Sequence, residues 1–314
     1  MAEITAGLVK DLRERTGAGM MDCKRALTEV EGDMEAAIDW LRKKGLAAAA
    51  KKAGRVASEG LVGVAIDDTS NGIAGAVVEI NAETDFVARN DTFQNLVRTT
   101  ALIAAKHDHT IDSLKTAAFP GESATVDEEI TRLIAVIGEN MHLRRIVRLS
   151  VSQGHVASYV HNAVAPNLGK IGVLVALESS GDKTQLADLG KRIAMHIAAA
   201  NPQALLIEDL DPSLLERERT IVTEQARASG RPEEIIAKMV DGRLRKFYEE
   251  VVLMEQTFII DGKTKIRDML ENAAKELGAP VHLKAYVRYA LGEGVEKAES
   301  NFAAEVQAQA GITG

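Results

Sequence analysis

Residues 61 to 80, LVGVAIDDTSNGIAGAVVEI, decide the class of fold. Apolar and β-branched residues fill positions 61–67 and 73–80, and the polar stretch 67–72 between them ends in Asn-Gly. Such runs on either side of Asn-Gly are typical of a β-hairpin, because asparagine and glycine accept the positive φ angles of a tight turn. The stretch therefore predicts two antiparallel strands.

Helical and strand patterns alternate after this hairpin. Apolar residues at helical spacing run from Phe93 to Ile103 and again over 126–140, and a strand pattern returns at 144–151. We therefore expect a core subdomain at 55–152 with the order strand, strand, helix, helix, strand.

A similar order recurs in the second half of the chain. The later patterns predict strands at 155–162 and 171–178, a helix at 182–199 and a strand at 281–291. This self-similarity indicates a second copy of the subdomain, at 153–202 and 251–291. The predicted fold class is α+β, with two related sheet-and-helix core subdomains.

Charged, helix-favouring sequence at 203–250 interrupts the second copy and is too long for an ordinary connection. Asp211-Pro212 is a typical helix start, and Ser229-Gly230 before Pro232 ends one helix and begins another. Apolar residues line the two segments at Leu214, Leu215, Ile221, Val222 and Ala228, and at Ile235, Ile236, Met239, Val240, Leu244 and Phe247. We predict an inserted antiparallel helical hairpin whose seven-residue repeat offers a coiled-coil surface for a homodimer.

Residues 1–54 predict a small helical domain with a linker helix. Three apolar stripes at helical spacing lie at 4–12, 26–30 and 34–41. The order of helix, glycine-containing loop, Ala-Leu helix and final helix is similar to the ubiquitin-associated module, which docks partners through its first loop. The alanine-rich basic segment 47–57 is expected to lead out of this bundle as a linker.

The C-terminal module, residues 292–314, is predicted to hold one short helix. Gly292-Glu-Gly294 breaks the last strand, and apolar residues then recur at Val295, Phe302, Ala303 and Val306. The final four residues are expected to fray.

Composition restricts compartment and partners. The 314 residues carry 46 acidic and 38 basic side chains, and the formal charge of -8 would repel a nucleic-acid backbone. The single cysteine, Cys23, allows no intramolecular disulfide, and the first fifteen residues lack a secretory signal. Apolar runs such as 171–177 are far shorter than the roughly 20 residues that span a bilayer. We therefore expect a cytoplasmic protein without direct nucleic-acid or membrane contact.

The sequence offers little for catalysis. It contains no phosphate-binding loop, dinucleotide fingerprint or nucleophile elbow. His107, Asp108 and His109 are adjacent and have no further Cys or His partners, which favours a solvated helix end over a metal site. Cys23 fits packing better than reactivity. We expect no enzyme activity, no metal and no cofactor.

Three other polar features have structural interpretations. Gly17 and Gly19 approach a glycine-rich cradle, but they join two helices and follow no strand. His196 lies on an apolar helix and is expected to be a satisfied core or interface histidine. The cluster 142–145, His-Leu-Arg-Arg, is expected at a solvated or partner-facing strand end, since the acidic total disfavours phosphate binding.

The segment 81–90, NAETDFVARN, places Phe86 among polar and charged neighbours in a chain that is only 4% aromatic. One interpretation makes Thr84 or Asp85 the cap of the next helix and Phe86 a staple packed against that helix. The other makes Phe86 an exposed apolar wedge for a partner. The pattern alone leaves both interpretations open.

Several motifs, taken in order, resemble signature segments of the elongation factor Ts family. They are Thr16-Gly-Ala-Gly-Met-Met-Asp-Cys-Lys24, Thr84-Asp-Phe-Val-Ala-Arg-Asn90, Ile137-Gly-Glu-Asn140, Ile193-Ala-Met-His196, Gly292-Glu-Gly294 and Phe302-Ala-Ala-Glu-Val306. The resemblance covers nearly the whole chain, and motifs in the right order are far more specific than any one of them.

The resemblance implies a guanine nucleotide exchange factor that binds elongation factor Tu with GDP, releases the GDP and leaves an empty form for GTP. It also implies a coiled-coil dimer through 203–250, while the segment 162–169 is longer than is usual in the family. The residues to which it assigns partner contacts are Thr84, Asp85, Phe86 and Val87 near the partner's magnesium site, Arg13, Met20 and Met21 in the N-terminal domain, and Ile137, Gly138 and His161 in the core.

Two other classes of function are compatible with parts of the sequence. A ubiquitin-associated-type adaptor would need only residues 1–45 to choose its partner, but it leaves the duplicated core and the Phe86 segment unexplained. An enzyme with a site between the two core copies would need a convergent polar cluster, and the sequence motifs supply none.

Overall fold

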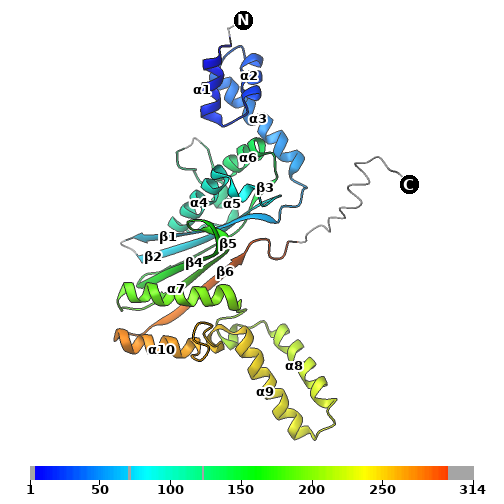
Figure 1. Ribbon diagram of the computed structural model, residues 1–314, viewed down its shortest axis with the longest axis vertical. Coiled ribbons are helices and arrows are strands. Elements are labelled where there is room, and N and C mark those ends of the chain that lie inside the picture. Colours follow the sequence, from blue (N-terminus) through cyan, green and yellow to red (C-terminus); the bar gives the residue numbers. More distant parts are fainter. Residues whose placement is uncertain (1–3, 70–71, 122–123, 296–314) are drawn as a thin grey trace, which may run out of the picture.

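The computed structural model describes residues 4–69, 72–121 and 124–295. A helical bundle, a body made of a sheet covered by helices, and a projecting pair of helices follow one another along its longest axis (Figure 1). The mixture of helices with an antiparallel sheet confirms the predicted α+β class.

The hairpin predicted from residues 61–80 is present and forms part of a six-stranded antiparallel sheet. Strand β1 (Glu59–Thr69) pairs with β2 (Gly72–Ala82) along its whole length, and β3 (Met141–Val151) pairs with the other side of β2. The helices of this half are α4 (Asp91–Lys106), α5 (Ile111–Lys115) and α6 (Val126–Ile137). The sequence analysis did not predict the short helix α5.

The second half repeats this arrangement of strands. Strand β5 (Leu168–Glu178) lies between β4 (Gly154–Ala165) and β6 (His282–Ala290), as β2 lies between β1 and β3. Its helices are α7 (Lys183–Ala200) and α10 (Ile266–Leu277). Helix α10 was missed, although its apolar residues have helical spacing and Ile266, Met269 and Leu270 are buried.

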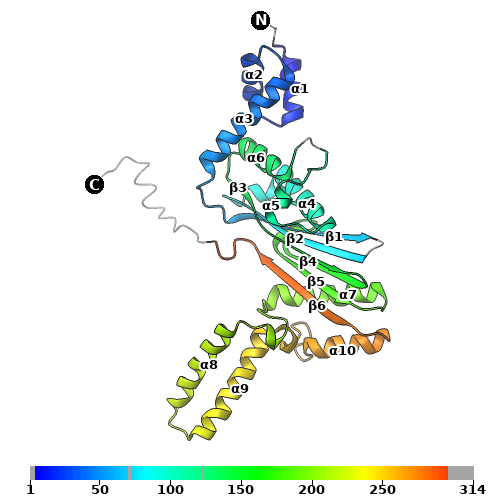
Figure 2. The ribbon, with the colours of Figure 1, turned by 180° about the vertical axis from the view of Figure 1, so that it is seen from behind.

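A short antiparallel pairing of β1 with β5, at Val62–Gly169 and Gly63–Leu168, joins the two halves into one six-stranded sheet. The two halves of this sheet pack face to face, with the helices on their outer faces (Figures 1 and 2). Along β1, Leu61 and Ala65 pack in the core against α4, whereas Val62 and Val64 pack in the core between the two halves of the sheet. Gly172 on β5 permits this approach, because a Cβ atom there would lie 2.6 Å from Val62 Cγ1. Alternating side chains thus build one core on each side of a strand.

The buried carboxylate of Glu79 on β2 joins the two halves at one edge. It accepts hydrogen bonds from Arg144 at 3.0 Å and Arg145 at 2.5 Å on β3, and from the backbone N–H of Gly292 at 2.9 Å after β6. Burial raises the pKa of Glu79, but bonds from Gly292 and Arg145 outweigh it and hold that pKa below its ordinary value. The expectation of a solvated or partner-facing strand end is therefore wrong for these two arginines.

The N-terminal bundle consists of α1 (Ala6–Thr16), α2 (Met20–Glu29) and α3 (Met34–Lys52). The basic segment expected as a linker helix belongs largely to α3, which continues without a break through Gly45. This glycine packs against α6, and a Cβ atom on it would lie 3.6 Å from Ala135 Cβ. Helix α3 therefore docks on the body.

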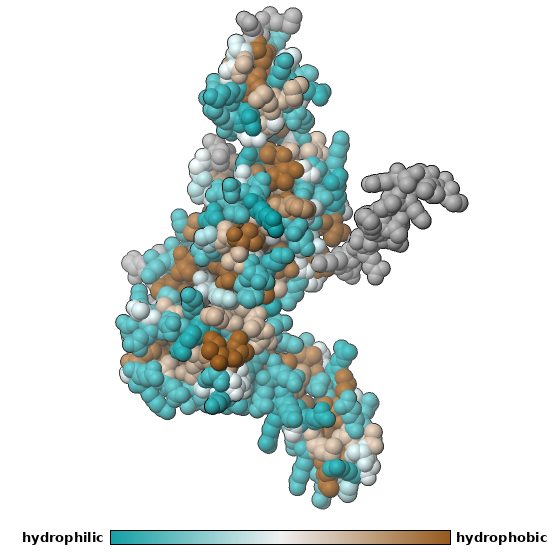
Figure 3. Space-filling view, viewed as in Figure 1, coloured by the Kyte–Doolittle hydropathy of each residue, from teal (hydrophilic) through white to brown (hydrophobic). Residues whose placement is uncertain are grey.

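Two antiparallel helices, α8 (Pro212–Arg227) and α9 (Glu233–Val251), project from the second half (Figures 1 and 2). The residues packed between them are Val222, Ala226, Ile236, Val240 and Leu244. Ile221 and Ile235 instead face outward, being 39% and 42% exposed. Figure 3 shows hydrophilic residues over most of this hairpin, with hydrophobic ones along it. The 3-10 turn η2 (Ile207–Asp209) precedes α8, and the 3-10 turn η3 (Leu253–Glu255) follows α9.

Two sequence expectations concern the ends and the membrane. The predicted C-terminal helix lies beyond Val295, outside the described residues. Within the described part of the chain, no helix combines the length and the apolar character needed to cross a membrane.

Candidate functional site

The loop between β2 and α4 presents Phe86 to solvent. The side chain of Phe86 is 77% exposed, and Asp85 before it is also exposed. Val87, the next residue, is only 3% exposed and begins the 3-10 turn η1 (Val87–Arg89). An exposed aromatic side chain therefore stands directly beside a residue anchored in the core.

Helix α4 begins without help from Phe86 or its neighbours. Asn90 caps the helix, because its Oδ1 accepts hydrogen bonds from the backbone N–H groups of Thr92 at 2.9 Å and Phe93 at 3.2 Å. The interpretation in which Thr84 or Asp85 caps the helix and Phe86 packs as a staple is therefore wrong.

The start of the loop is held by hydrogen bonds to the segment that follows α6. The Glu139 carboxylate accepts hydrogen bonds from the backbone N–H and the hydroxyl of Thr84, and Asn140 donates its backbone N–H to Glu83 at 2.5 Å. Gly138 allows this arrangement, since it ends α6 with a φ of 89° and turns the chain toward the loop.

Ile137 and Gly138, expected to contact the partner, lie at this support. Ile137 is half-buried against the first core and Gly138 is exposed. The supporting acids Glu83 and Glu139 were not singled out from the sequence. The positions of Glu83 beside Thr84 and of Glu139 after a helix-ending glycine were the signals available.

The N-terminal candidates lie on the bundle, away from the loop in sequence. Met20 and Met21 are exposed and occupy the first turn of α2, directly after the loop that follows α1. Arg13 is exposed in the last turn of α1. Two long apolar side chains at a helix start give the bundle an exposed apolar patch.

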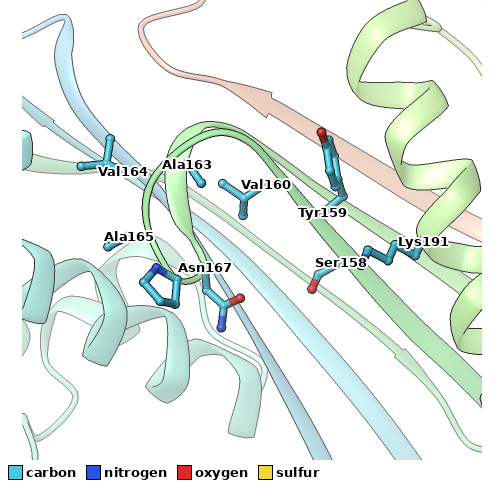
Figure 4. A pocket seen from close by; sticks show the side chains of 9 residues that line it. Ser158, Tyr159, Val160, Ala163, Val164, Ala165, Asn167 and Lys191 are labelled. Carbon is cyan, nitrogen blue, oxygen red and sulfur yellow. The ribbon is translucent and has the colours of Figure 1, made fainter.

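His161 lies exposed on β4, where its Nδ1 is 3.1 Å from the hydroxyl of Tyr159. The longer segment 162–169 forms the tip of the β4–β5 hairpin, which contacts β1 through a 3.0 Å hydrogen bond from Val64 N–H to the Asn167 carbonyl. A shallow hollow of about 420 Å³ lies beside this tip. Figure 4 shows Tyr159 and Asn167 among its lining residues.

Two further candidates of the sequence, Cys23 and Asp108, have internal partners. Cys23 is buried, and burial raises the pKa of its thiol. Asp108 pairs with Arg148 at 2.9 Å. The described residues include no group of three or more His, Cys, Asp or Glu side chains placed to hold a metal ion.

His196 is a satisfied core histidine, as predicted. It is fully buried, its Nδ1 accepts the Ile259 N–H at 3.3 Å, and its Nε2 lies 2.9 Å from Gln256 Oε1. Because Nδ1 accepts, we assign the proton to Nε2, which donates to Gln256. Burial lowers the pKa of this imidazole despite the bond to Gln256.

Comparison with known proteins identifies the family. Residues 83–293 match the family described as Elongation factor TS. The chain is 65% identical to elongation factor Ts of Rhodospirillum centenum over 311 residues, covering 99% of this chain and 100% of that protein. It is 66% identical to that of Rhodospirillum rubrum, covering 98% and 99%. The identity is 63% with that of Paramagnetospirillum magneticum, covering 99% and 98%. The chain therefore belongs to the elongation factor Ts family.

Proposed function

We propose that this chain acts on elongation factor Tu through the Phe86 loop, residues 83–90. As a member of its family, it is a guanine nucleotide exchange factor of translation elongation, which promotes GDP release from elongation factor Tu so that GTP can bind. The observation that carries the proposed site is the contrast between Phe86, 77% exposed, and Val87, 3% exposed. A large apolar side chain on a fixed base is the kind of anchor that interfaces use.

Exchange by this route uses binding energy alone. An exchange protein that binds empty partner more tightly than GDP-bound partner also weakens the binding of GDP. The two fold-changes in affinity are equal, since the coupling between two ligands is reciprocal. Insertion of Asp85 and Phe86 near the partner's magnesium site would disturb the metal and the phosphate-binding groups. No catalytic acid, base or metal of this chain is needed for that step.

The N-terminal bundle provides a second docking element in this proposal. Arg13, Met20 and Met21 would contact the GTPase domain, and their exposure together at the α1–α2 junction supports this role. Ile137, Gly138 and His161 are proposed as further contacts. Gly138 lies beside the support of the Phe86 loop, which favours a contact near that loop.

We also propose that the chain forms a homodimer in the cytoplasm through the projecting hairpin, residues 203–250. The two outward-facing isoleucines, Ile221 and Ile235, support a contact on this hairpin. Covering an exposed apolar side chain with a second copy removes it from water and so lowers the free energy of the assembly. Most of the apolar stripe is already buried between α8 and α9, so the dimer contact would be small.

The function is tested by the release of a fluorescent GDP from purified elongation factor Tu. Adding this chain should raise the release rate in proportion to its concentration until it saturates. A rate equal to spontaneous release at saturating chain would reject exchange activity. Capture of ubiquitin-like proteins instead of elongation factor Tu would favour the adaptor class.

A further inference from the structure

Helix α6 contacts both elements for which partner binding is proposed. Its body packs against α3 of the N-terminal bundle, and the residue after its terminal glycine, Glu139, holds the Phe86 loop through Thr84. Figures 1 and 2 both show α3 and α6 side by side where the bundle meets the body. One helix therefore connects the two proposed docking elements.

Arg132 makes a polar link between α6 and the bundle. Its Nε and Nη2 each donate to one Glu129 oxygen at 2.7 Å, and its Nη1 donates to the Thr16 carbonyl at 2.9 Å. Glu129 is 4% exposed, so a buried carboxylate fixes the guanidinium that reaches the end of α1. The planar fork of arginine makes these contacts together, whereas the single ammonium of lysine does not match this geometry.

Gly17 completes this link from the side of the bundle. It ends α1 in the left-handed conformation with a φ of 65°, and a Cβ atom on it would lie 2.6 Å from Arg132 Nη1. Glycine is therefore favoured here both by the positive φ angle and by the space that the Arg132 guanidinium occupies. Met20 and Met21 follow after Ala18 and Gly19, so Gly17 lies three residues before the proposed docking surface.

Two further contacts tie α3 to α6. Arg42 forms an ion pair with Glu128 in the first turn of α6. Gly45 lies against Ala135, with the geometry given above for a Cβ atom. The bundle thus meets α6 at three levels, through Glu128, Arg132 and Ala135.

We propose that α6 is a rigid spacer that holds the N-terminal bundle at a set position relative to the Phe86 loop, with Arg132 as the positioning residue. The functional part rests on the docking roles proposed above for Met20, Met21 and Phe86. Two contact elements held in place bind as one preorganised surface, because little of their relative freedom is lost on binding.

The link itself is tested on the full chain without a partner. Spin labels on Lys24→Cys and Asn95→Cys, both exposed positions, report the distance from α2 to α4, while the thiol of Cys23 is buried. Arg132→Lys keeps a cation beside Glu129, and Gly17→Ala pushes on the link from α1. Either change should broaden the distance distribution about twofold. Unchanged widths would overturn the spacer.

Gly278→Ala is the matched control for Gly17→Ala. Gly278 ends α10 with a φ of 63°, and a Cβ atom on it would have no neighbour within 4 Å. It therefore carries the same backbone strain without touching the link. A control that broadens the distribution as much as Gly17→Ala would also overturn the assignment to Arg132.

The exchange assay tests what the spacer does. Arg132→Lys should raise the concentration for half-maximal GDP release about three- to tenfold and leave the maximal rate unchanged. Adding Arg132→Lys to a chain that already carries Met20→Ala and Met21→Ala should change the half-maximal concentration little, since the arginine and the methionines act through the same bundle. Effects that multiply would overturn the proposal. If the methionine changes alone have no effect, the docking role fails, while the distance measurement still decides the spacer.

Discussion

Glu139 accepts hydrogen bonds from both donors of Thr84, from the hydroxyl to Oε1 at 2.6 Å and from the backbone N–H to Oε2 at 2.9 Å. The neighbouring residues form the reverse contact, in which Asn140 donates to Glu83. These reciprocal bonds fix the start of the Phe86 loop. Phe86 is therefore presented from a rigid base, and the loop need not be ordered when a partner binds.

Glu139→Ala should lower the stimulation of GDP release about three- to tenfold, because the loop loses two charge-assisted hydrogen bonds and samples more conformations. The assay is fluorescent GDP release at subsaturating chain. Glu178→Ala is the control, since it removes an ion pair with Lys284 in the second half of the molecule. Normal exchange by the Glu139→Ala chain would show that the loop needs no such support.

Arg145→Met should cost about 3 kcal/mol of unfolding free energy, because it removes one partner of the fully buried Glu79 carboxylate. Arg148→Met, on the same strand, should cost less, about 1 to 2 kcal/mol, since its charged partner Asp108 is 88% exposed and its other partner, the Ala105 carbonyl at 2.8 Å, carries no charge. Urea unfolding of both chains measures the difference. Equal losses would contradict a special role for the Glu79 cluster in joining the two halves.

Much of the fold follows from local patterns. The Asn-Gly hairpin, the long helices and the projecting hairpin were predicted because their periodicity is set by neighbours in sequence. Helix α10 was missed although its spacing carried the signal. The inward direction of Arg144 and Arg145 was not predictable, since it depends on Glu79 and Gly292, residues distant in sequence that only the folded sheets bring together.

His196 should reduce stability in mild acid. Burial lowers the pKa of His196 in the folded chain, whereas the pKa of a histidine in the unfolded chain is about 6.5. The unfolded state then binds more protons below that pH, so the unfolding free energy falls as pH drops through about 6.5 toward the folded pKa. Thermal unfolding at about pH 7.5 and about pH 5.5 should show a smaller loss for His196→Gln than for the unchanged chain.

His196→Gln should remove only part of the stability loss in acid, because burial also lowers the pKa of His142 and of His155. Their contributions have the same sign and remain in the variant. An equal acid loss in the variant and the unchanged chain would mean that His196 is free to take up a proton in the fold.

Ile221→Lys together with Ile235→Lys should convert a dimer into a monomer with about half its mass in light scattering. Both side chains face outward, so the melting temperature of the folded chain should change little. Ile260→Lys, another exposed position, serves as control. An unchanged mass in the double variant, or a monomeric parent chain, would contradict dimerisation through this hairpin.

The candidate site was predictable in part. Phe86 stood out in the sequence because it is apolar among charged neighbours, but the staple and wedge geometries were equally compatible with that pattern. The cap at Asn90 and the contact between Thr84 and Glu139 distinguish the geometries, and the second joins residues 55 positions apart. Long-range contacts of this kind leave no local periodicity to detect.

The central claim is that exposed Phe86 drives exchange, and Phe86→Ala tests it when melting temperature and GDP release are measured on one preparation. The account predicts nearly unchanged melting and at least about a tenfold loss of stimulated release, equivalent to roughly 1.4 kcal/mol of lost contact. Val87→Ala, at the neighbouring buried residue, should instead lower the melting temperature. A Phe86→Ala chain with normal release per folded molecule would contradict the account.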